Sequence, residues 1–313
     1  MSEPNIKKNV REFYDRVGWQ MVDESLYQNA RYEDLRPVSR EYIHRCHMRI
    51  NRHLAREGRY LLDAGSGPVQ YPEYLTYSEG YQARVCMDIS IVALKEARKR
   101  LGEHGLYVVG DIAHLPFKSD VFDGIVSLHT IHHVPMEDKL PAYNELYRTL
   151  NPGKTMAIVN GWTNAPLSKW LSGFANFIKR FRGWWLRKSN NQKPGVVNQN
   201  STPVELADVE EKSSAKPSGT YIQKLNAEWL AQALEGRMDF EILVWRSVSV
   251  SFLRSVIYPD WGGRFWLKVL FWIEDRFPRL LGRIGQYPLV VIHKPEADTE
   301  NKKSKTVNKT PAV

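Results

Sequence analysis

The sequence predicts an α/β fold, in which a doubly wound, mostly parallel sheet carries helices on both of its faces. Four short apolar runs are bounded by residues that break regular structure, at 60–62, 83–87, 106–109 and 124–128. Such runs suit strands that are buried on both faces of a parallel sheet. Helical patterns lie between them, as at 91–102, where Leu94, Ala97 and Leu101 recur at helical spacing. This alternation of strand and helix favours right-handed crossover connections.

Three carboxylates follow these runs, each where a buried strand passes into a loop. They are Asp63, which precedes the glycines Gly65 and Gly67, then Asp88 and Asp111. The two glycines let the backbone adopt positive φ and approach a ligand closely. In open α/β sheets, ligands bind outside the carboxyl ends of the strands. A single nucleoside-containing cofactor that spans several strand ends would contact all three carboxylates.

Four linked motifs between residues 55 and 163 resemble the class I S-adenosylmethionine-dependent methyltransferases. The likeness is to the small-molecule branch that includes quinone-biosynthesis enzymes, with a methyltransferase type 11-like domain. It implies S-adenosyl-L-methionine as cofactor and a seven-stranded, Rossmann-like sheet. It also implies cofactor contacts: Asp63, Gly65 and Gly67 around the methionine part, Asp88 and Ile89 at the ribose, Asp111 and Ile112 at the adenine, Leu128 and His129 beside the sulfur, and Tyr14 from a segment that closes over the cofactor. The chain departs from the family pattern at Val69, where many members have a third glycine, and at Lys154, where Pro-Gly-Gly is usual.

A nicotinamide-dependent dehydrogenase would begin with a similar strand, turn and helix. Its fingerprint requires a third glycine where this chain has Gln70. Its glycine turn also binds a pyrophosphate, which Asp63 would repel. A tight turn without any ligand is the other reading of the glycines, and the presence of Asp88 and Asp111 argues against it.

The chain divides into five predicted parts. They are a helical N-terminal cap at 1–54, a cofactor-binding core at 55–164, a basic amphipathic helix with a polar mobile insertion at 165–222, the C-terminal part of the sheet with a second basic aromatic insertion at 223–295, and a disordered tail at 296–313. A helix is expected at 141–150, stopped by Asn-Pro-Gly, and another at 225–236 with Asn226 as its N-cap. The last two strands, at 240–249 and 287–293, pair antiparallel in the family.

Two segments carry the excess of positive charge and six of the ten tryptophans. Residues 165–188 hold six basic residues and no acid, and residues 251–285 hold six basic residues and three acids, which together account for the net charge of +9. In the first segment apolar residues form one helical face: Leu167, Trp170, Leu171, Phe174, Ile178, Phe181 and Trp185. Aromatic amphipathic helices rimmed by cations are typical of segments that bind an anionic membrane surface. A lid over the substrate pocket is the alternative, and nucleic-acid binding is disfavoured because stacking on bases does not require one helical face.

Histidines supply the candidate catalytic groups. Removing a proton from a hydroxyl or enol acceptor suits histidine, and His129, His132 and His133 follow the fourth strand on the cofactor's side of the sheet. His129 is the best candidate for contact with the acceptor or the cofactor. The spacing of the histidines is not that of a known zinc motif, so we expect no metal site.

The sequence therefore predicts a methyltransferase that acts on a small or lipid-linked acceptor, most readily at oxygen. Two cysteines, a polar N-terminus and the lack of a long apolar run predict a cytoplasmic location. The two basic aromatic segments predict a peripheral position on the inner face of the membrane. A non-catalytic cofactor-binding or membrane-adaptor protein of the same fold is the rival outside the enzyme class. A methyltransferase of protein or nucleic acid is the rival within it.

Overall fold

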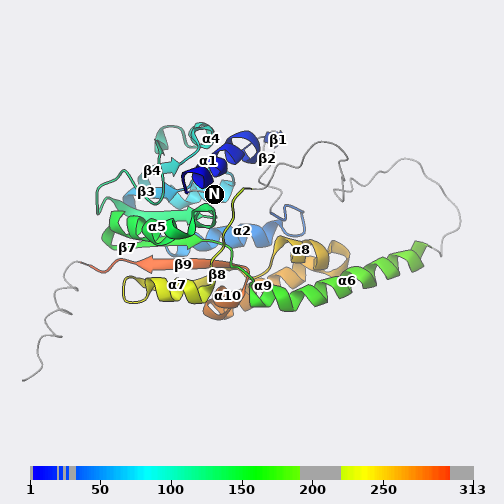
Figure 1. The fold of residues 1–313 in the computed structure, drawn as a ribbon. Helices are drawn as coiled ribbons and strands as arrows, with labels where there is room; N and C mark the ends of the chain where they lie inside the picture. Colours follow the sequence, from blue (N-terminus) through cyan, green and yellow to red (C-terminus); the bar gives the residue numbers. More distant parts are fainter. Residues whose placement is uncertain (1–2, 20, 24–25, 28–32, 191–219, 297–313) are drawn as a thin grey trace, which may run out of the picture.

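A seven-stranded sheet forms the centre of the protein in the computed structural model, which describes residues 3–19, 21–23, 26–27, 33–190 and 220–296 (Figure 1). Its strand order is β5-β4-β3-β6-β7-β9-β8, with β9 antiparallel to both of its neighbours and the other pairs parallel. The strands are β3 (Gly58–Ala64), β4 (Tyr81–Asp88), β5 (Gly105–Val109), β6 (Phe122–Leu128), β7 (Leu150–Val159), β8 (Asp239–Arg246) and β9 (Tyr287–His293). The expected mostly parallel sheet with an antiparallel final pair is confirmed.

Helices cover both faces of this sheet, as a doubly wound fold requires. They are α1 (Glu3–Phe13), α2 (Arg40–Met48), α3 (Pro72–Leu75), α4 (Ile91–Leu101), α5 (Met136–Thr149), α6 (Pro166–Asn190), α7 (Ala227–Leu234), α8 (Val250–Val256), α9 (Gly263–Arg276) and α10 (Pro278–Ile284). Leu146 of α5 and Leu230 of α7 pack into the core on one face. Tyr74 of α3 and Leu94 of α4 pack into the core on the other.

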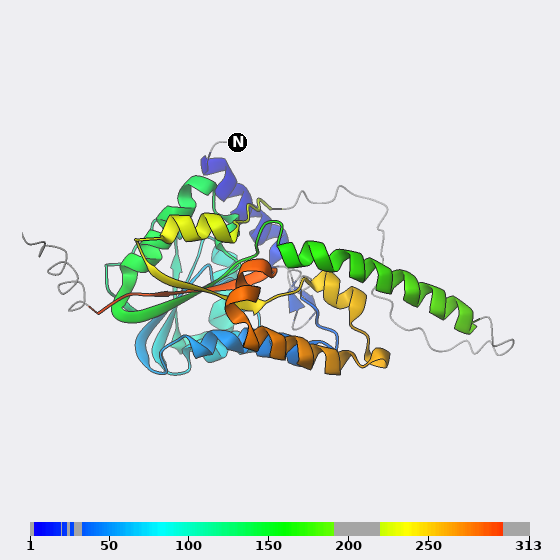
Figure 2. The ribbon, with the colours of Figure 1, turned by 90° about the horizontal axis from the view of Figure 1, so that it is seen from below.

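A third apolar cluster joins α2, α8 and α9 beside the sheet. Its buried members include Tyr42, Leu253 and Phe271, and Leu171 of α6 packs against it. Seen from below, α6, α8 and α9 extend together away from the sheet on one side (Figure 2). Within the described residues, no helix is both long enough and apolar enough to cross a bilayer.

Two expectations for the middle of the chain need correction. Helix α5 begins at Met136, so Pro141 lies inside the helix rather than at its start. The helix tolerates the proline because the carbonyl that it leaves unbonded belongs to Glu137, an exposed residue of the first turn. Asn-Pro-Gly at 151–153 does follow the helix, but it forms the first part of β7 rather than a loop.

The N-terminal cap and the eighth strand also differ from expectation. A two-stranded sheet of β1 (Met21–Asp23) and β2 (Leu26–Tyr27) interrupts the segment 6–53 that was expected to be helical. Strand β8 ends at Arg246, because Ser249 caps α8 by accepting a hydrogen bond from the Phe252 amide. The predicted helix at 225–236 is α7, where the Asn226 side chain accepts from the Trp229 amide as expected.

Some predicted features fall outside the described residues. Of the insertion predicted at 165–222, residues 191–219 are not described, whereas 189–190 end α6. Of the tail at 296–313, only the first residue is described. The two cysteines are described, and both are free and buried. Burial raises the pKa of the Cys46 and Cys86 thiols to about 12, so both stay protonated.

Candidate functional site

A cavity of about 390 Å³ lies at the carboxyl edge of the parallel strands. It is formed by the loops that follow β3, β4, β5 and β6, with α1 beside them. Every residue that the sequence proposed for the site lines it: Tyr14, Asp63, Gly65, Gly67, Asp88, Ile89, Asp111, Ile112, Leu128, His129, His132 and His133. The fold therefore brings all of these residues together in one place.

The glycine turn after β3 is closely packed. Gly65 and Gly67 have φ values of +77° and +53°. A Cβ atom at Gly65 would lie 2.2 Å from the Thr130 hydroxyl oxygen, and one at Gly67 would lie 3.0 Å from the Trp19 ring. Val69, the departure from the family pattern, is fully buried and also has a positive φ of +53°. The turn thus keeps its left-handed geometry at that position at the cost of backbone strain.

Asp88 is the carboxylate that ends β4. Its two oxygens accept hydrogen bonds from the backbone amides of Gly67 and Ser90, both at 2.9 Å. Burial raises the pKa of the carboxyl to about 6, and no ion pair offsets it within the described residues. Each oxygen keeps a lone pair for a further donor. Asp88 is half-buried and has no cationic partner among the described residues, but it can accept two more hydrogen bonds. Such a carboxylate fits a pair of ribose hydroxyls.

Asp111, after β5, is bound by the N-terminal helix. Its carboxylate accepts from Lys7 Nζ at 2.6 Å and from the Ala113 amide at 3.0 Å, and Lys7 also pairs with Asp138 of α5. Burial alone would raise the pKa of Asp111, but the Lys7 and Ala113 hydrogen bonds lower it overall. Through this contact α1 is held across the end of the cavity that was assigned to adenine.

Asp63 forms an ion pair with Arg84 inside the protein. It is almost fully buried, and Oδ2 accepts from Nε of the buried Arg84 at 3.1 Å. One of its oxygens is therefore engaged in an internal ion pair beneath the glycine turn.

His133 forms the most defined polar contact of the three histidines. Its Nδ1 lies 2.8 Å from the Tyr221 carbonyl oxygen, to which it must donate, and so Nε2 accepts from the Tyr14 hydroxyl at 2.7 Å. Burial lowers the pKa of His133 to about 4. The ring is therefore neutral at neutral pH, with a defined tautomer and its acceptor nitrogen on Tyr14.

His129 and His132 are held differently. The His129 backbone has a φ of +57°, and its amide donates to the Val159 carbonyl at 2.7 Å. Burial, with the positive charge of Arg246, lowers the pKa of His129 to about 3. Burial likewise lowers the pKa of His132 well below its usual value, and His132 Nδ1 is buried with no hydrogen-bond partner in the described structure. Both rings therefore offer neutral, desolvated nitrogens.

Several residues that line the cavity were not expected from the sequence: Lys7, Glu33, Tyr71, Lys224, Arg246 and Tyr287. The strand-end rule could have found Arg246, because it ends β8 at the same edge of the sheet as Asp88. No local pattern marks Lys7, Glu33 or Lys224, which tertiary packing alone brings to the cavity.

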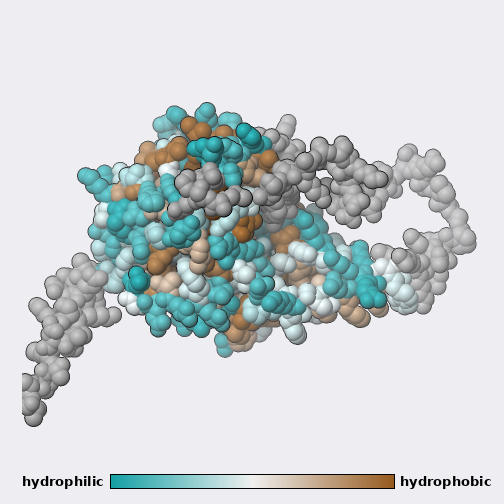
Figure 3. Space-filling model, in the orientation of Figure 1, coloured by the Kyte–Doolittle hydropathy of each residue, from teal (hydrophilic) through white to brown (hydrophobic). Residues whose placement is uncertain are grey.

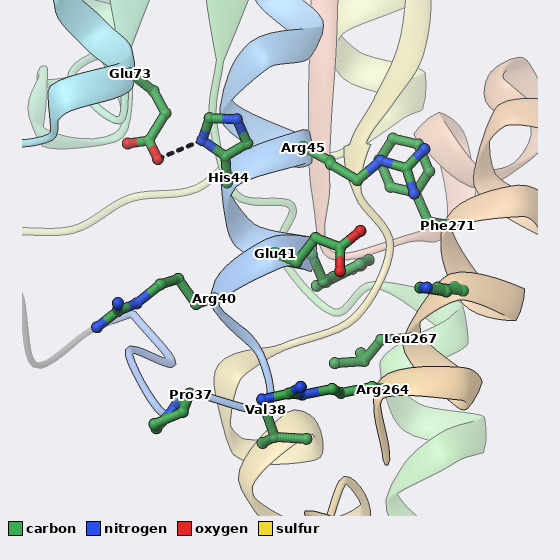
Figure 4. Close-up of a pocket in the computed structure, with 12 residues that line it drawn as sticks. Pro37, Val38, Arg40, Glu41, His44, Arg45, Glu73, Arg264, Leu267 and Phe271 are labelled. Atoms are coloured by element: carbon green, nitrogen blue, oxygen red, sulfur yellow. Dashed lines mark hydrogen bonds and ion pairs between the residues drawn. The ribbon is translucent and has the colours of Figure 1, made fainter. Parts of the chain in front are cut away.

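A second cavity, of about 400 Å³, lies between α2 and α9 (Figure 4). Its walls carry exposed cations, including Arg40 and Arg264, and His44 contacts Glu73 there at 2.7 Å. None of the residues proposed for the site lines this cavity. Among the described residues, no group of three or more His, Cys, Asp or Glu is arranged to hold a metal ion.

Comparisons with known proteins agree with this geometry. A family model described as a methyltransferase domain matches residues 62–158. A probable phthiotriol/phenolphthiotriol dimycocerosates methyltransferase of Mycobacterium ulcerans is 25% identical over 165 residues, which cover 49% of this chain and 63% of that protein. A ubiquinone/menaquinone biosynthesis C-methyltransferase of Cereibacter sphaeroides is 33% identical over 124 residues, which cover 37% and 48%. The chain thus spans less than two thirds of the length of these relatives.

One solved structure shares the fold over nearly the whole chain. It is Haemonchus contortus phosphoethanolamine N-methyltransferase 1, in complex with phosphoethanolamine and S-adenosylhomocysteine. The TM-score is 0.53 at 9% sequence identity, over 99% of this chain and 56% of that one. At this identity the likeness extends to the fold alone.

Proposed function

We propose, from the premise that residues 62–158 are a class I S-adenosylmethionine-dependent methyltransferase domain, that the protein transfers a methyl group to a small or lipid-linked acceptor. We further propose that the acceptor atom is oxygen and that the reaction takes place at a membrane surface. Relatives named for phthiotriol dimycocerosates and for ubiquinone and menaquinone support a small or lipid-linked acceptor.

One observation carries the proposal. Two carboxylates, a glycine turn and a histidine cluster lie side by side in one cavity, at the ends of four neighbouring strands. Asp111 follows β5, Asp88 ends β4, Gly65 follows β3 and His129 follows β6. A cofactor that lies along Asp111, Asp88 and Gly65 would bring its methyl-bearing sulfur close to His129.

The residues that would hold the cofactor follow from this order. Asp88 would accept both ribose hydroxyls, the glycine turn would accommodate the methionine part, and Asp111 would lie at the adenine. When bound, S-adenosylmethionine supplies a methyl group on a positively charged sulfur, and transfer removes that charge. The protein's main task is then to align the acceptor with that methyl group and to exclude water.

The contact between Tyr14 and His133 supports an oxygen acceptor. A hydroxyl must lose its proton as it is methylated. We propose that Tyr14 takes that proton on its phenol oxygen while its own proton passes to His133 Nε2, 2.7 Å away. Burial opposes a positive charge on His133. However, the cavity loses one positive charge on methyl transfer, so a proton gained by His133 leaves its net charge unchanged.

Exposed aromatic side chains support action at a membrane surface. One face of α6 packs on the apolar cluster through Leu171, with Ala175 buried. A second face carries an exposed aromatic stripe at helical spacing, which consists of Trp170, Phe174, Phe177, Phe181 and Trp184. Trp170 is 78% exposed, which is far more than a side chain in a lid packed on its pocket would be.

Other exposed apolar residues lie on α9, on α10 and between these two helices. They are Phe265, Trp266, Trp272, Phe277 and Leu280. Hydrophobic residues are visible along the lower edge of the molecule in Figure 3, where Figure 1 shows α6, α9 and α10. Exposed cations such as Lys169 and Arg180 lie next to the stripe. An apolar surface with positive charges beside it matches the interface of a bilayer with anionic lipids.

Calorimetry on Asp88 tests the cofactor site. Asp88→Ala should weaken S-adenosylhomocysteine at least about tenfold, because it removes two charge-assisted hydrogen bonds worth ~1.5–3 kcal/mol each. Asp239→Ala is the matched control, because Asp239 begins β8 at the opposite edge of the sheet and is exposed. Equal affinity in the parent and in Asp88→Ala, or no binding by the parent, would remove the basis of the proposal.

A further inference from the structure

One cation in the cavity has no acidic partner among the residues that the structure describes. Among the described residues, its charged lining side chains are Lys7, Glu33, Asp63, Asp88, Asp111, Lys224 and Arg246. Lys7 pairs with Asp111, Asp63 pairs with Arg84, and Arg246 pairs with Glu33. Asp88 is the carboxylate proposed for the ribose hydroxyls. Lys224 is then the charged residue for which neither the described structure nor the proposed cofactor contacts provide a partner.

The strand order places Lys224 beyond the histidines. Its side chain lies over the end of β7, where a Cβ atom at Gly161 would be 3.2 Å from Lys224 Nζ. The neighbouring strand ends carry His129, after β6, and Gly65, after β3. Since adjacent strands lie ~4.8 Å apart, Lys224 is about 10 Å along the sheet from the glycine turn. His129 lies between them.

The backbone around Lys224 is firmly attached. The Lys224 carbonyl accepts from the Thr163 hydroxyl, and the Leu225 carbonyl accepts from the Thr163 amide, both at 2.8 Å. The buried Lys139 donates to the Gln223 carbonyl at 2.6 Å and to the Ile131 carbonyl at 3.0 Å, which ties this segment to the histidine loop. Lys224 is therefore held in place at the cavity wall.

The surroundings of Lys224 favour the binding of an anion. Burial lowers the pKa of Lys224, and no acid counteracts that effect. A desolvated ammonium is costly unless it is paired. Nearby, Arg246 is only 1% exposed and its Nε atom has no hydrogen-bond partner in the described structure. The buried His132 Nδ1 lacks one too.

We infer that Lys224 binds an oxyanion of the methyl acceptor, on the side of the histidines that faces away from the glycine turn. The oxyanion is either a permanent carboxylate or an acidic hydroxyl that has lost its proton, and it is a different group of the acceptor from the hydroxyl that Tyr14 deprotonates. Arg246 and His132 line the same cavity. This inference rests on the proposed methyl transfer, and it names the acceptor class as an oxyacid or an acidic alcohol.

The test begins with the acceptor. A metabolite and lipid extract of the source cells is fractionated on an anion exchanger, and each fraction is assayed for methyl transfer from tritium-labelled S-adenosylmethionine. We expect the accepting activity in material retained at pH 7, for a carboxylate, or retained only at about pH 11, for a hydroxyl. Acceptor activity found only in material that is retained at neither pH would contradict the inference alone. No label in any fraction, with S-adenosylhomocysteine still bound, would contradict the methyl transfer itself.

Variants then test the residue. Lys224→Gln should raise the apparent KM for the active fraction at least tenfold, and Lys224→Arg should recover most of the loss. The Kd for S-adenosylhomocysteine should stay within twofold of the parent in both variants. Lys118→Gln, which removes an exposed lysine outside the cavity, controls for net charge. A tenfold loss of S-adenosylhomocysteine affinity in Lys224→Gln would show that Lys224 binds the cofactor and would overturn the inference, as would an unchanged KM.

Discussion

The proposed proton pathway of the site rests on two side chains, Tyr14 and His133. The Tyr221 carbonyl orients His133, so that Nε2 is the nitrogen that faces the Tyr14 hydroxyl. Tyr14 also stacks on Trp19, with ring centroids 5.0 Å apart. Loss of the hydroxyl alone would therefore keep the ring packing and break the pathway from acceptor to histidine.

Tyr14→Phe should lower kcat by a factor on the order of 100, because general base catalysis by a positioned group contributes at least that much. Binding of S-adenosylhomocysteine should change less than threefold, since the ring stays in place. Both values can be measured on the same preparation, by labelled methyl transfer and by calorimetry.

Tyr221→Phe is the matched control for this substitution. Its phenol contacts Gln223 and does not line the cavity, while its carbonyl, which orients His133, is unaffected. A normal kcat in Tyr14→Phe would leave His129 as the remaining base candidate, and would assign catalysis mainly to alignment if His129→Asn were also normal.

At the scale of elements, α6 has two apolar faces with different roles. Periodicity indicated one such face that included both Leu171 and Trp170. In the structure Leu171 packs on the cluster of α2, α8 and α9, whereas Trp170 points into solvent. The helix therefore has enough apolar surface both to dock on the protein and to bind a second partner.

The purified protein should sediment with phosphatidylglycerol vesicles, less with phosphatidylcholine vesicles, and less as salt rises, since each cation near an anionic surface contributes ~1 kcal/mol. Replacing Trp170 and Phe177 with serine should weaken binding even at low salt, because apolar burial is lost. Replacing Lys169 and Arg180 with glutamine should mainly reduce the salt dependence.

The double variant Leu106→Ser, Val109→Ser is the matched control for the replacement of Trp170 and Phe177. Leu106 and Val109 are exposed and lie on β5, which is at the opposite end of the strand order from β8. Arg182 is left unchanged because its guanidinium packs 3.5 Å from the Tyr258 ring centre. If the parent binds none of these vesicles, the stripe serves the substrate pocket or another partner, and the acceptor is more readily a soluble metabolite.

At the scale of the whole molecule, the three histidines of the site link folding to pH. The pKa values of His129 and His133 are about 3 and about 4 in the folded protein, and that of His132 is also lowered. In the unfolded chain histidine titrates near 6.5. Between these values the unfolded chain binds more protons, so the free energy of unfolding falls as pH falls. Asp88, with a pKa of about 6, has the opposite effect, because its carboxyl binds a proton more tightly in the folded protein. It therefore offsets the contribution of about one histidine.

These four groups alone leave a difference of about two protons, which predicts a loss of stability on the order of 2–3 kcal/mol per pH unit near pH 5. Urea unfolding at several pH values between 4.5 and 7.5 measures this slope. His129→Asn should reduce it by about 1.4 kcal/mol per pH unit, and asparagine accepts the positive φ of this position. An unchanged slope in His129→Asn would contradict the linkage.

The sequence by itself determined the sheet and the shared edge where the cofactor residues lie. Buried parallel strands require continuous apolar runs, and the residues that end them must meet at one edge, so Asp88, Asp111 and His129 could be grouped from their positions in the chain alone. The N-cap of α7 was equally local, because Asn226 bonds an amide only three residues away.

Tertiary structure decided the contacts between distant segments. The pairing of Lys7 with Asp111 and of Glu33 with Arg246 joins residues more than a hundred positions apart, and no local pattern encodes it. The position of Lys224 depends on how the segment after residue 219 returns to the end of β7. The difference between the two apolar faces of α6 arises because α8 covers only one of them. Local periodicity indicates which side chains share a face, but the neighbour that covers a face is determined only by packing in three dimensions.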